Sequence, residues 1–228
     1  MTVTVLVPVY NETRSIATVL RKVVEKAPSA EVIVIDDGST DGTSEILQRL
    51  NQELPFRLLR HAHNCGKGAA LRTGLREARG EAVLIQDADL EYDPVDYPKL
   101  LEPLRDGRSA VIYGSRFLDP RRSTSRWHRF GNWLVTAAVN LLFRSSLTDV
   151  ETCYKVFRRD VLGAIPLRAR GFEFEVEVTC KLLRRRQAIV EIPVSYYGRS
   201  YAEGKKITWR DGVMALWVIV ACRVNPWY

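Results

Sequence analysis

One acidic segment of the sequence has the residue types and the spacing of a metal site. Gln86-Asp87-Ala88-Asp89-Leu90-Glu91 directly follows the hydrophobic run Ala82–Ile85. Side chains at alternate positions of an extended segment point the same way, so Asp87, Asp89 and Glu91 would converge. Converging carboxylates repel one another unless a cation joins them, and oxygen ligands suit Mg²⁺ or Mn²⁺, which substrate phosphates commonly share. The segment therefore predicts a divalent cation that holds a phosphorylated ligand.

A second acidic pair indicates ligand contact nearby. Asp36 and Asp37 end the run Glu31–Ile35, and Asp41-Gly42 behind them already supplies a turn and a helix cap. Two further carboxylates exceed what a turn requires, so we expect them to contact a ligand. The first hydrophobic run ends in Pro8-Val9-Tyr10-Asn11-Glu12, which has none of the glycines of a dinucleotide-binding turn. The sequence therefore disfavours NAD binding.

Two other polar segments carry less information. Gly66-Lys67-Gly68 opens an expected helix, and these residues suit either an anion at the helix N-terminus or a plain helix start. His61 and His63 flank the end of an expected strand, and we assign them to the loop rather than to a metal site.

Hydrophobic periodicity predicts the elements that position these residues. In the first half, β-branched runs alternate with helical patterns, which is typical of a largely parallel sheet covered by helices on both faces. In such sheets ligands bind at the carboxyl ends of the strands. The strands are expected at Val3–Val9, Glu31–Ile35, Phe56–Arg60, Ala82–Ile85 and Ala110–Tyr113, and the helices at Thr13–Lys26, Thr43–Leu50, Gly68–Ala78 and Val95–Leu104.

The second half is less regular, and nothing in it divides the chain into domains. A basic stretch precedes an apolar helix, and a final helix is expected at the end of the sequence. The expected elements are a helix at Phe130–Phe143, a strand at Tyr154–Arg158, a helix at Glu175–Arg186, a strand at Ala188–Val194, a loop at Ser195–Lys206 and a helix at Thr208–Val224.

Composition fits one α/β domain with an anionic partner. The 228 residues are 46% hydrophobic, and the basic excess lies in residues 121–228, which hold 19 basic and 9 acidic side chains. The four cysteines lack the spacing of a disulfide framework or a zinc site. The sequence starts without a secretory signal, and its longest apolar run, Val213–Cys222, is half of what a membrane span needs. We therefore expect a cytoplasmic protein.

Seven motifs in order give the sequence a family resemblance. The motifs PVYNE, DDGSTDG and DADLE are followed by Gly114-Ser115-Arg116, then by a segment from Thr148 to Lys155, by Gly171-Phe172-Glu173, and by a segment from Tyr197 to Lys206. The chain resembles family 2 glycosyltransferases of GT-A fold, and most closely the dolichol-phosphate mannosyltransferases and their bacterial polyprenyl-phosphate relatives. It departs from them at Thr152-Cys153-Tyr154, where Ser-Gly-Phe is usual, and from its short apolar runs we expect none of the membrane-spanning tail that many relatives carry.

The resemblance implies one domain with three parts: a nucleotide-sugar and metal half at 1–115, an acceptor half at 116–206, and an amphipathic, interfacial helix at 207–228. It implies Mg²⁺ or Mn²⁺ on Asp87 and Asp89, with Glu91 as a third ligand. It also implies catalytic roles for Asp89, Arg116 and Asp149. The residues expected to bind the nucleotide sugar are Pro8, Tyr10, Glu12, Asp37, Gln86, Asp87, Ala88, Asp89, Arg199 and Lys205, and those expected to bind an acceptor phosphate are Arg116, Arg126 and Arg129.

The implied reaction is inverting transfer of a hexose, mannose first, from GDP-mannose to dolichyl or polyprenyl phosphate. Such an acceptor is already anionic and needs no general base, whereas a hydroxyl acceptor needs one. Two alternatives remain: UDP-glucose as donor, or a hydroxyl acceptor with Glu173, Glu175 or Asp149 as base.

The expected partners follow from the acceptor and the charge. A lipid acceptor stays in the bilayer, so we expect peripheral contact with the cytoplasmic face of the membrane through Trp127–Phe143 and Thr208–Val224, although exposed aromatic side chains there would also suit a homodimer. Nucleic acid is disfavoured, because aromatic and basic residues do not interleave and the acidic DADLE segment would repel phosphate.

Overall fold

The computed structural model describes residues 1–118, 126–198 and 208–225, and among these the side chains of residues 126–129 and 209 are not described. A seven-stranded sheet runs through the molecule in the order β3-β2-β1-β4-β6-β5-β7. All neighbouring strands are parallel except β6, which lies antiparallel between β4 and β5. The strands are β1 (Val3–Val9), β2 (Glu31–Asp36), β3 (Arg57–Arg60), β4 (Ala82–Ile85), β5 (Val111–Ser115), β6 (Lys155–Arg158) and β7 (Val190–Pro193).

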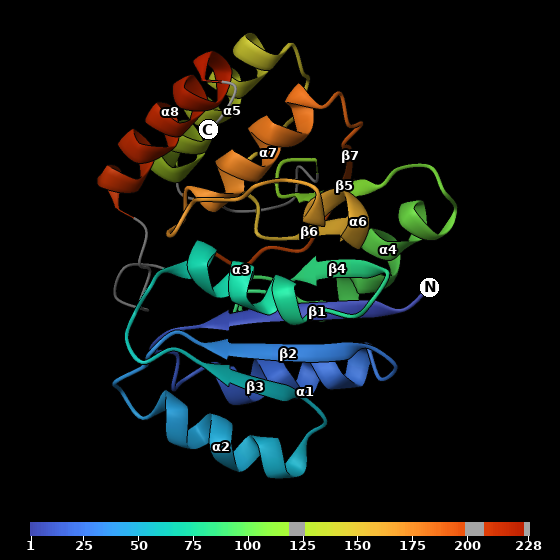
Figure 1. Cartoon of the computed structure of the whole chain (residues 1–228), viewed down its shortest axis with the longest axis vertical. Coiled ribbons are helices and arrows are strands. Elements are labelled where there is room, and N and C mark those ends of the chain that lie inside the picture. The colour runs from blue at the N-terminus through green and yellow to red at the C-terminus, as the bar shows by residue number, and fades with distance from the viewer. Residues whose placement is uncertain (119–125, 199–207, 226–228) are drawn as a thin grey trace.

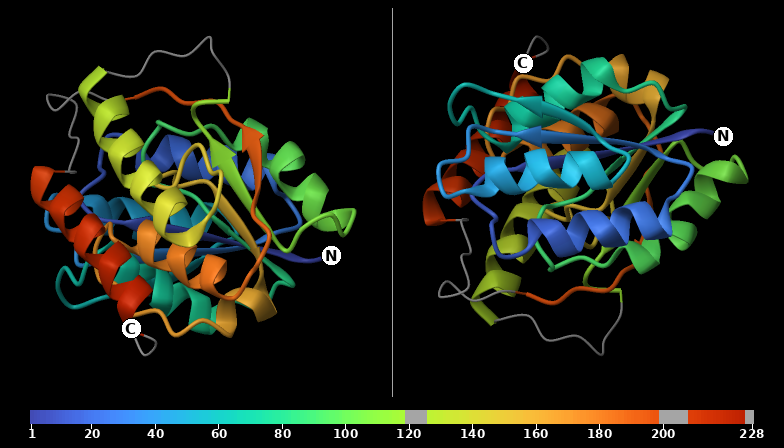
Figure 2. Two further views of the ribbon diagram at one scale, coloured as in Figure 1. Left: turned by 90° about the horizontal axis from the view of Figure 1, so that it is seen from above. Right: turned by 90° about the horizontal axis from the view of Figure 1, so that it is seen from below.

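Helices cover both faces of the sheet. Figure 2 shows α3 on one face of β1 and β2 and α1 on the other, and Figure 1 shows α5, α7 and α8 gathered beyond β6, β5 and β7. The helices are α1 (Ile16–Lys26), α2 (Thr43–Glu53), α3 (Lys67–Glu77), the 3₁₀ turn η1 (Pro94–Asp96), α4 (Tyr97–Arg105), α5 (Arg126–Phe143), α6 (Arg159–Gly163), α7 (Phe174–Arg184) and α8 (Trp209–Val224).

The expected α/β architecture and nearly every expected element are confirmed. The antiparallel β6 makes the sheet mixed, and η1 and α6 were not predicted because they are too short for a periodic pattern. Helix α5 begins at Arg126, four residues before the expected start at Phe130. No helix in the described residues combines the length and the apolar character that crossing a bilayer requires.

Apolar side chains form two separate clusters. The larger one surrounds the sheet and includes every residue of β1 except Thr4 and Pro8. The smaller one joins α5, α7 and α8, and we call these three helices the helix cluster. The buried members of this smaller apolar cluster, two of which come from the loop after α5, are Val135, Val139, Leu147, Val150, Val176, Cys180, Ala215, Val218, Ile219 and Cys222.

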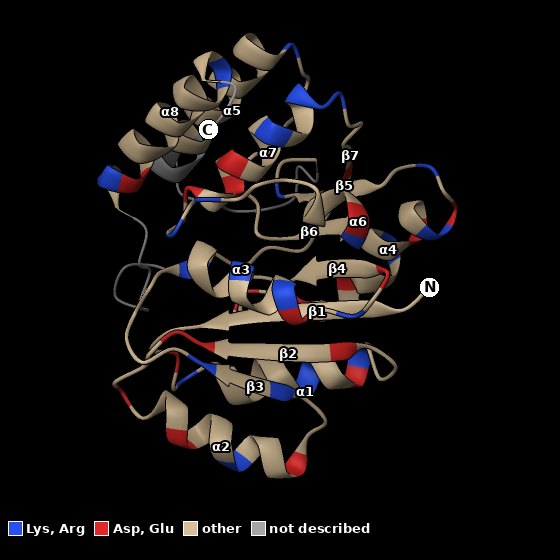
Figure 3. Ribbon diagram, in the orientation of Figure 1, with Lys and Arg blue, Asp and Glu red and all other residues tan. Residues whose placement is uncertain are grey.

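The helix cluster also exposes large apolar side chains, and this corrects one prediction. We predicted an amphipathic C-terminal helix, but α8 is apolar both inward and outward. Most of its length carries no charged residue (Figure 3). We refer to the following side chains as the exposed apolar set: Phe130, Trp133, Leu134 and Leu141 of α5, and Val213, Met214, Trp217, Val220 and Val224 of α8.

Candidate active site

A cleft of about 330 Å³ opens at the carboxyl ends of β1, β2 and β4, which is where ligands bind in sheets of this kind. Eight of the residues predicted to bind a nucleotide sugar or its metal line it, namely Pro8, Tyr10, Glu12, Asp37, Asp87, Ala88, Asp89 and Glu91. The sheet thus brings together side chains from three segments that are far apart in the sequence.

Gln86 is the one described residue among these predictions that faces away from the cleft. Its side chain is fully buried, and its Oε1 accepts hydrogen bonds from the hydroxyls of Tyr97 (2.7 Å) and Tyr154 (2.8 Å). Its amide nitrogen donates to the Asp87 carbonyl at 2.9 Å. Contact between Gln86 and a nucleotide sugar is therefore a wrong prediction. Gln86 instead holds the backbone of the segment from Gln86 to Glu91, which we call the acidic turn, from its buried side.

The two carboxylates at the end of β2 have separate roles. Asp36 accepts hydrogen bonds from the Ser39 amide and the Ser44 hydroxyl, so it organises the turn and the start of α2. Asp37 lines the cleft and accepts from the backbone amides of Cys65 (2.9 Å) and Gly66 (2.7 Å). The pair that looked redundant in the sequence thus consists of one structural and one cleft-facing residue.

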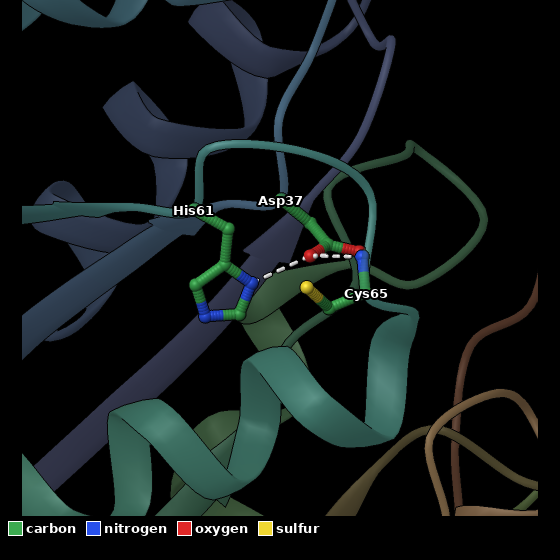
Figure 4. Close-up of side chains that lie close together, drawn as sticks. All are labelled: Asp37, His61 and Cys65. Atoms are coloured by element: carbon green, nitrogen blue, oxygen red, sulfur yellow. Dashed lines mark hydrogen bonds and ion pairs between the residues drawn. The ribbon is translucent and has the colours of Figure 1, made fainter.

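His61 supports Asp37 from the side (Figure 4). Its Nδ1 lies 2.6 Å from Asp37 Oδ1, and its Nε2 lies 3.0 Å from the Thr73 hydroxyl. Within the described residues, Asp37, His61 and Cys65 are also the one group of three metal-ligand types whose atoms lie within 4.8 Å of one another. Because both ring nitrogens of His61 and both oxygens of Asp37 already have protein partners, we interpret the group as a support for the loop.

Lys67 is the residue at the site whose importance the sequence did not reveal. Its Nζ lies 2.7 Å from Asp87 Oδ1 and 3.0 Å from Glu175 Oε1, and its side chain is only 12% exposed. Burial alone would lower the pKa of Lys67, but the surrounding negative charge, with Asp87 first, raises that pKa well above its ordinary value. Lys67 therefore stands at the acidic turn as a permanent cation.

The three acids of the turn are held apart in this structure. Lys67 contacts Asp87, the Glu91 amide donates to Asp89 Oδ1 at 3.0 Å, and the Tyr196 hydroxyl donates to Glu91 Oε2 at 3.0 Å. All three acids line the cleft, yet their oxygens do not fall within 4.8 Å of one another. The three carboxylates thus line one cleft, but they are not arranged as a ready-made metal site.

Glycines let a loop close over the start of α3. The Gly68 and Ala69 amides donate to the carbonyls of Gly171 (3.2 Å) and Arg170 (3.1 Å). A Cβ at Gly66 would lie 2.3 Å from the Arg170 carbonyl oxygen, and the φ of +95° at Gly66 also favours glycine. The Gly68 and Ala69 amides at the start of α3 therefore bond within the protein.

A buried lysine ties the loop before β6 to α7. Lys155 is fully buried, and its Nζ donates to Glu175 Oε2 (2.6 Å), to the Val150 carbonyl (3.0 Å) and to the Thr152 carbonyl. Desolvation lowers its pKa, which the negative charge of Glu175 partly offsets. The loop between α5 and β6 is held in place by these contacts.

Arg116 and Asp149 form a two-point ion pair beside that loop. Arg116 donates from Nε to Asp149 Oδ2 and from a terminal nitrogen to Oδ1, both at 2.7 Å, and its backbone amide adds a bond of 2.9 Å. Asp149 is fully buried and Arg116 is 15% exposed. With both oxygens occupied, Asp149 is suited to orienting Arg116 and poorly suited to accepting a proton.

A smaller pocket of about 80 Å³ adjoins the cleft and shares Lys67, Asp87, Glu91 and Phe172 with it. Arg116 lines it, and so do Asp211 and Ala215 in the first turns of α8. Glu173 and Glu175, the candidate bases for a hydroxyl acceptor, line it as well, and its other lining residues are Tyr92, Glu151, Cys153 and Tyr196. This pocket connects the cleft to the helix cluster.

Four predicted site residues lie outside the described part of the chain. Arg199 and Lys205 fall in residues 199–207, and the side chains of Arg126 and Arg129 are not described. Their expected contacts with a diphosphate and an acceptor phosphate stay predictions.

Comparisons with known proteins agree with this geometry. The family model "Glycosyl transferase family 2" matches residues 4–165. An undecaprenyl-phosphate mannosyltransferase of Micrococcus luteus is 31% identical over 90% of this chain and 87% of its own length. A dolichol-phosphate mannosyltransferase of Pyrococcus furiosus is 27% identical over 90% of this chain but only 59% of its own length.

Among solved structures, glucosyl-3-phosphoglycerate synthase of Mycobacterium tuberculosis in complex with Mn²⁺, UDP and glucosyl-3-phosphoglycerate superposes with a TM-score of 0.77 at 20% identity. The match covers 97% of this chain and 80% of that one. At this identity the likeness shows the fold alone. The family is shown by the family model, which matches most of the chain, and by the Micrococcus relative at 31% identity. The chain therefore belongs to glycosyl transferase family 2 and is a glycosyltransferase.

Proposed function

We propose that this glycosyltransferase moves mannose from GDP-mannose to a polyprenyl phosphate, with inversion at the sugar carbon and with Mg²⁺ or Mn²⁺ on Asp87 and Asp89. One observation carries the proposal. The small pocket shares lining residues with the carboxylate-lined cleft and is also lined by Asp211 and Ala215 in the first turns of α8, so a phosphate held there would lie between the cleft and a helix whose outward face is apolar. The similarity to the Micrococcus luteus undecaprenyl-phosphate mannosyltransferase supports the same acceptor class.

The cleft suits the donor. Pro8, Tyr10 and Asp37 lie at its β1 and β2 side, where the nucleotide would bind, and the acidic turn lies at its β4 side, where the diphosphate would bind. The donor set fits a divalent ion, because Asp87 and Asp89 offer carboxylate oxygens and the Lys67 ammonium already occupies a cation position 2.7 Å from Asp87 Oδ1. A bound ion would stabilise the negative charge of the departing diphosphate.

The acceptor side follows from charge. A monophosphate oxygen is anionic at neutral pH, so the protein has to offset repulsion between acceptor and donor rather than remove a proton. Arg116, oriented by Asp149, offers its guanidinium in the small pocket for this purpose. Attack from this side, with the diphosphate leaving toward the cleft, inverts the configuration at the sugar carbon.

The exposed apolar set suits a lipid surface. Trp133 is 61% exposed and Trp217 is 57% exposed, and arginines 144, 210 and 223 lie near the ends of the same helices. Tryptophan and arginine beside exposed aliphatic side chains are typical of contact with the interfacial region of a bilayer. We therefore propose that the protein contacts the cytoplasmic face of a membrane as a peripheral protein.

The test is transfer of label into lipid. Purified protein, Mn²⁺ and a short polyprenyl phosphate are incubated in parallel with radiolabelled GDP-mannose, UDP-glucose and other nucleotide sugars, and the organic phase is counted. We expect label from GDP-mannose in the lipid. Label in the lipid from UDP-glucose alone would support the lipid acceptor but replace GDP-mannose with UDP-glucose as the donor. Consumption of donor with a hydroxyl acceptor but not with the lipid would overturn the acceptor assignment and direct attention to Glu173.

A further inference from the structure

Lys67 takes the place of a cation at the acidic turn. It is the first residue of α3, and the closed loop at Ala169–Gly171 fixes the backbone on either side of it. Its ammonium reaches Asp87 Oδ1 at 2.7 Å, which is the carboxylate that we propose as a metal ligand. An ammonium and a divalent ion would therefore compete for the same oxygen.

A second acceptor for the ammonium lies within reach. Glu175 Oε1 is buried and makes no directed hydrogen bond, although Lys67 Nζ lies 3.0 Å from it. The ammonium therefore pairs with both carboxylates at once in this structure. If Asp87 turned to a divalent ion, Lys67 would keep Glu175 as its partner.

The position of Lys67 also places it where a diphosphate would lie. It lines both the cleft and the small pocket, together with Asp87 and Glu91. A divalent ion added alone would bring two positive charges next to a lysine that is already charged, and like charges at such short range repel. A diphosphate added with the ion supplies negative charge that attracts both cations.

We propose that Lys67 is an internal counter-ion that holds Asp87 until a donor diphosphate arrives, so that divalent-cation binding depends on the diphosphate. Lys67 is thus a positioning residue that couples the two ligands, and it acts through Asp87. The inference rests on the proposed metal site at Asp87 and Asp89. Because binding free energies are linked reciprocally, the lysine must also make diphosphate binding more dependent on the cation.

Direct binding of Mn²⁺ tests the proposal without any turnover. Free Mn²⁺ is measured by electron paramagnetic resonance during titration of the full chain, alone and with saturating GDP or UDP. Both nucleotides are used because the diphosphate, and not the base, carries the effect. The variants are Lys67→Met, which removes the charge at similar length, and Lys67→Arg, which keeps it. Lys22→Met is the matched control, because Lys22 pairs with Asp93 at 2.8 Å outside the cleft.

We expect Lys67→Met to bind Mn²⁺ alone about tenfold more tightly than the wild type, and to lose about the same factor from the gain that the nucleotide gives. Lys67→Arg should restore the dependence, and Lys22→Met should match the wild type. Equal Mn²⁺ affinity in Lys67→Met and the wild type, with binding lost in Asp87→Asn, overturns the role of Lys67 and leaves the metal site standing. Absence of Mn²⁺ binding with nucleotide in the wild type overturns both.

Discussion

The cleft and the helix cluster differ in which of their side chains the protein itself covers or pairs. The cleft collects buried or half-buried charges at the ends of strands whose side chains are almost all apolar, and each described charge has a protein partner, as Lys67 has Asp87 and as Asp37 has the amides of Cys65 and Gly66. Helices α5 and α8 of the helix cluster have few charges and leave apolar side chains in solvent, with Leu141 80% exposed. Charges are thus satisfied within the protein, whereas the exposed apolar set is not.

The difference shows which part of the site is complete in the isolated chain. A paired charge in a low-dielectric cleft is already oriented for a ligand. A large exposed apolar surface, in contrast, is typical of a region that is covered by a partner or a membrane. The small pocket lies between the two regions, since Arg116 and the first turns of α8 both line it. The following predictions separate the two regions.

The largest effect is expected in the cleft. Asp89→Ala should lower kcat at least about 1,000-fold, because it removes a proposed cation ligand beside the diphosphate. Addition of EDTA to the wild type should give a similar loss. Initial rates of label transfer measure both, and Asp160→Ala, an exposed acid on α6, should retain wild-type rates. Full activity of Asp89→Ala would remove the metal from the proposed function.

A smaller effect is expected where the two regions meet. Arg116→Lys keeps the charge but loses the two-point contact with Asp149, so kcat/KM for the lipid acceptor should fall about 100-fold. The KM for the nucleotide sugar should stay within about twofold, because Arg116 lines the small pocket and not the cleft. Varying one substrate at a time distinguishes these effects, and an equal loss for both substrates would argue against a separate acceptor site.

Substitutions on the exposed face of the helix cluster should have a measurable effect only when a bilayer is present. Trp133→Ser and Trp217→Ser should each weaken binding to vesicles with anionic lipid about tenfold, since each variant removes an exposed tryptophan. Activity on a short, water-soluble acceptor should not change. Vesicle sedimentation measures the binding, and the molar mass of each variant by light scattering tests the alternative that these residues form a dimer interface.

The smallest effect concerns a carboxyl group in the small pocket. Burial raises the pKa of Glu151 above its ordinary value. A carboxyl whose pKa is higher in the folded than in the unfolded state favours folding while it is protonated, and this advantage is lost as the pH rises through the folded-state value. Glu151→Gln should therefore raise Tm by about 2 °C at pH 8 and leave it nearly unchanged at pH 4. Thermal unfolding followed by circular dichroism at both pH values is the measurement.

The sequence predicted the sheet end well because its strands are short, apolar and followed directly by polar residues. Asp37, Asp87 and Asp89 follow from this order alone, since parallel strands place their carboxyl ends at one edge. Gln86 could not be distinguished from them, because its partners Tyr97 and Tyr154 come from other elements. The role of Lys67 also depends on a distant residue, Glu175.

The helix cluster was harder to predict for a related reason. The sequence of α8 shows which of its side chains are apolar, but not which of them pack against another helix. Only the packing of α8 against α5 and α7 decides that Val218 is buried and that Trp217 is exposed. Propensity and periodicity do not contain this information.

The strand order has a consequence for synthesis on the ribosome. The run β3-β2-β1-β4 uses only residues up to Ile85, so all its strand pairs are available before β5 has been made. The nascent chain can thus form the part of the sheet that carries Asp37. The apolar strand β4, however, stays unpaired on one side until β6 is made, about seventy residues later in the sequence. An exposed strand edge is a template for wrong pairing. A pause or a chaperone contact at this stage would therefore affect the yield of folded protein more than the same event later in translation.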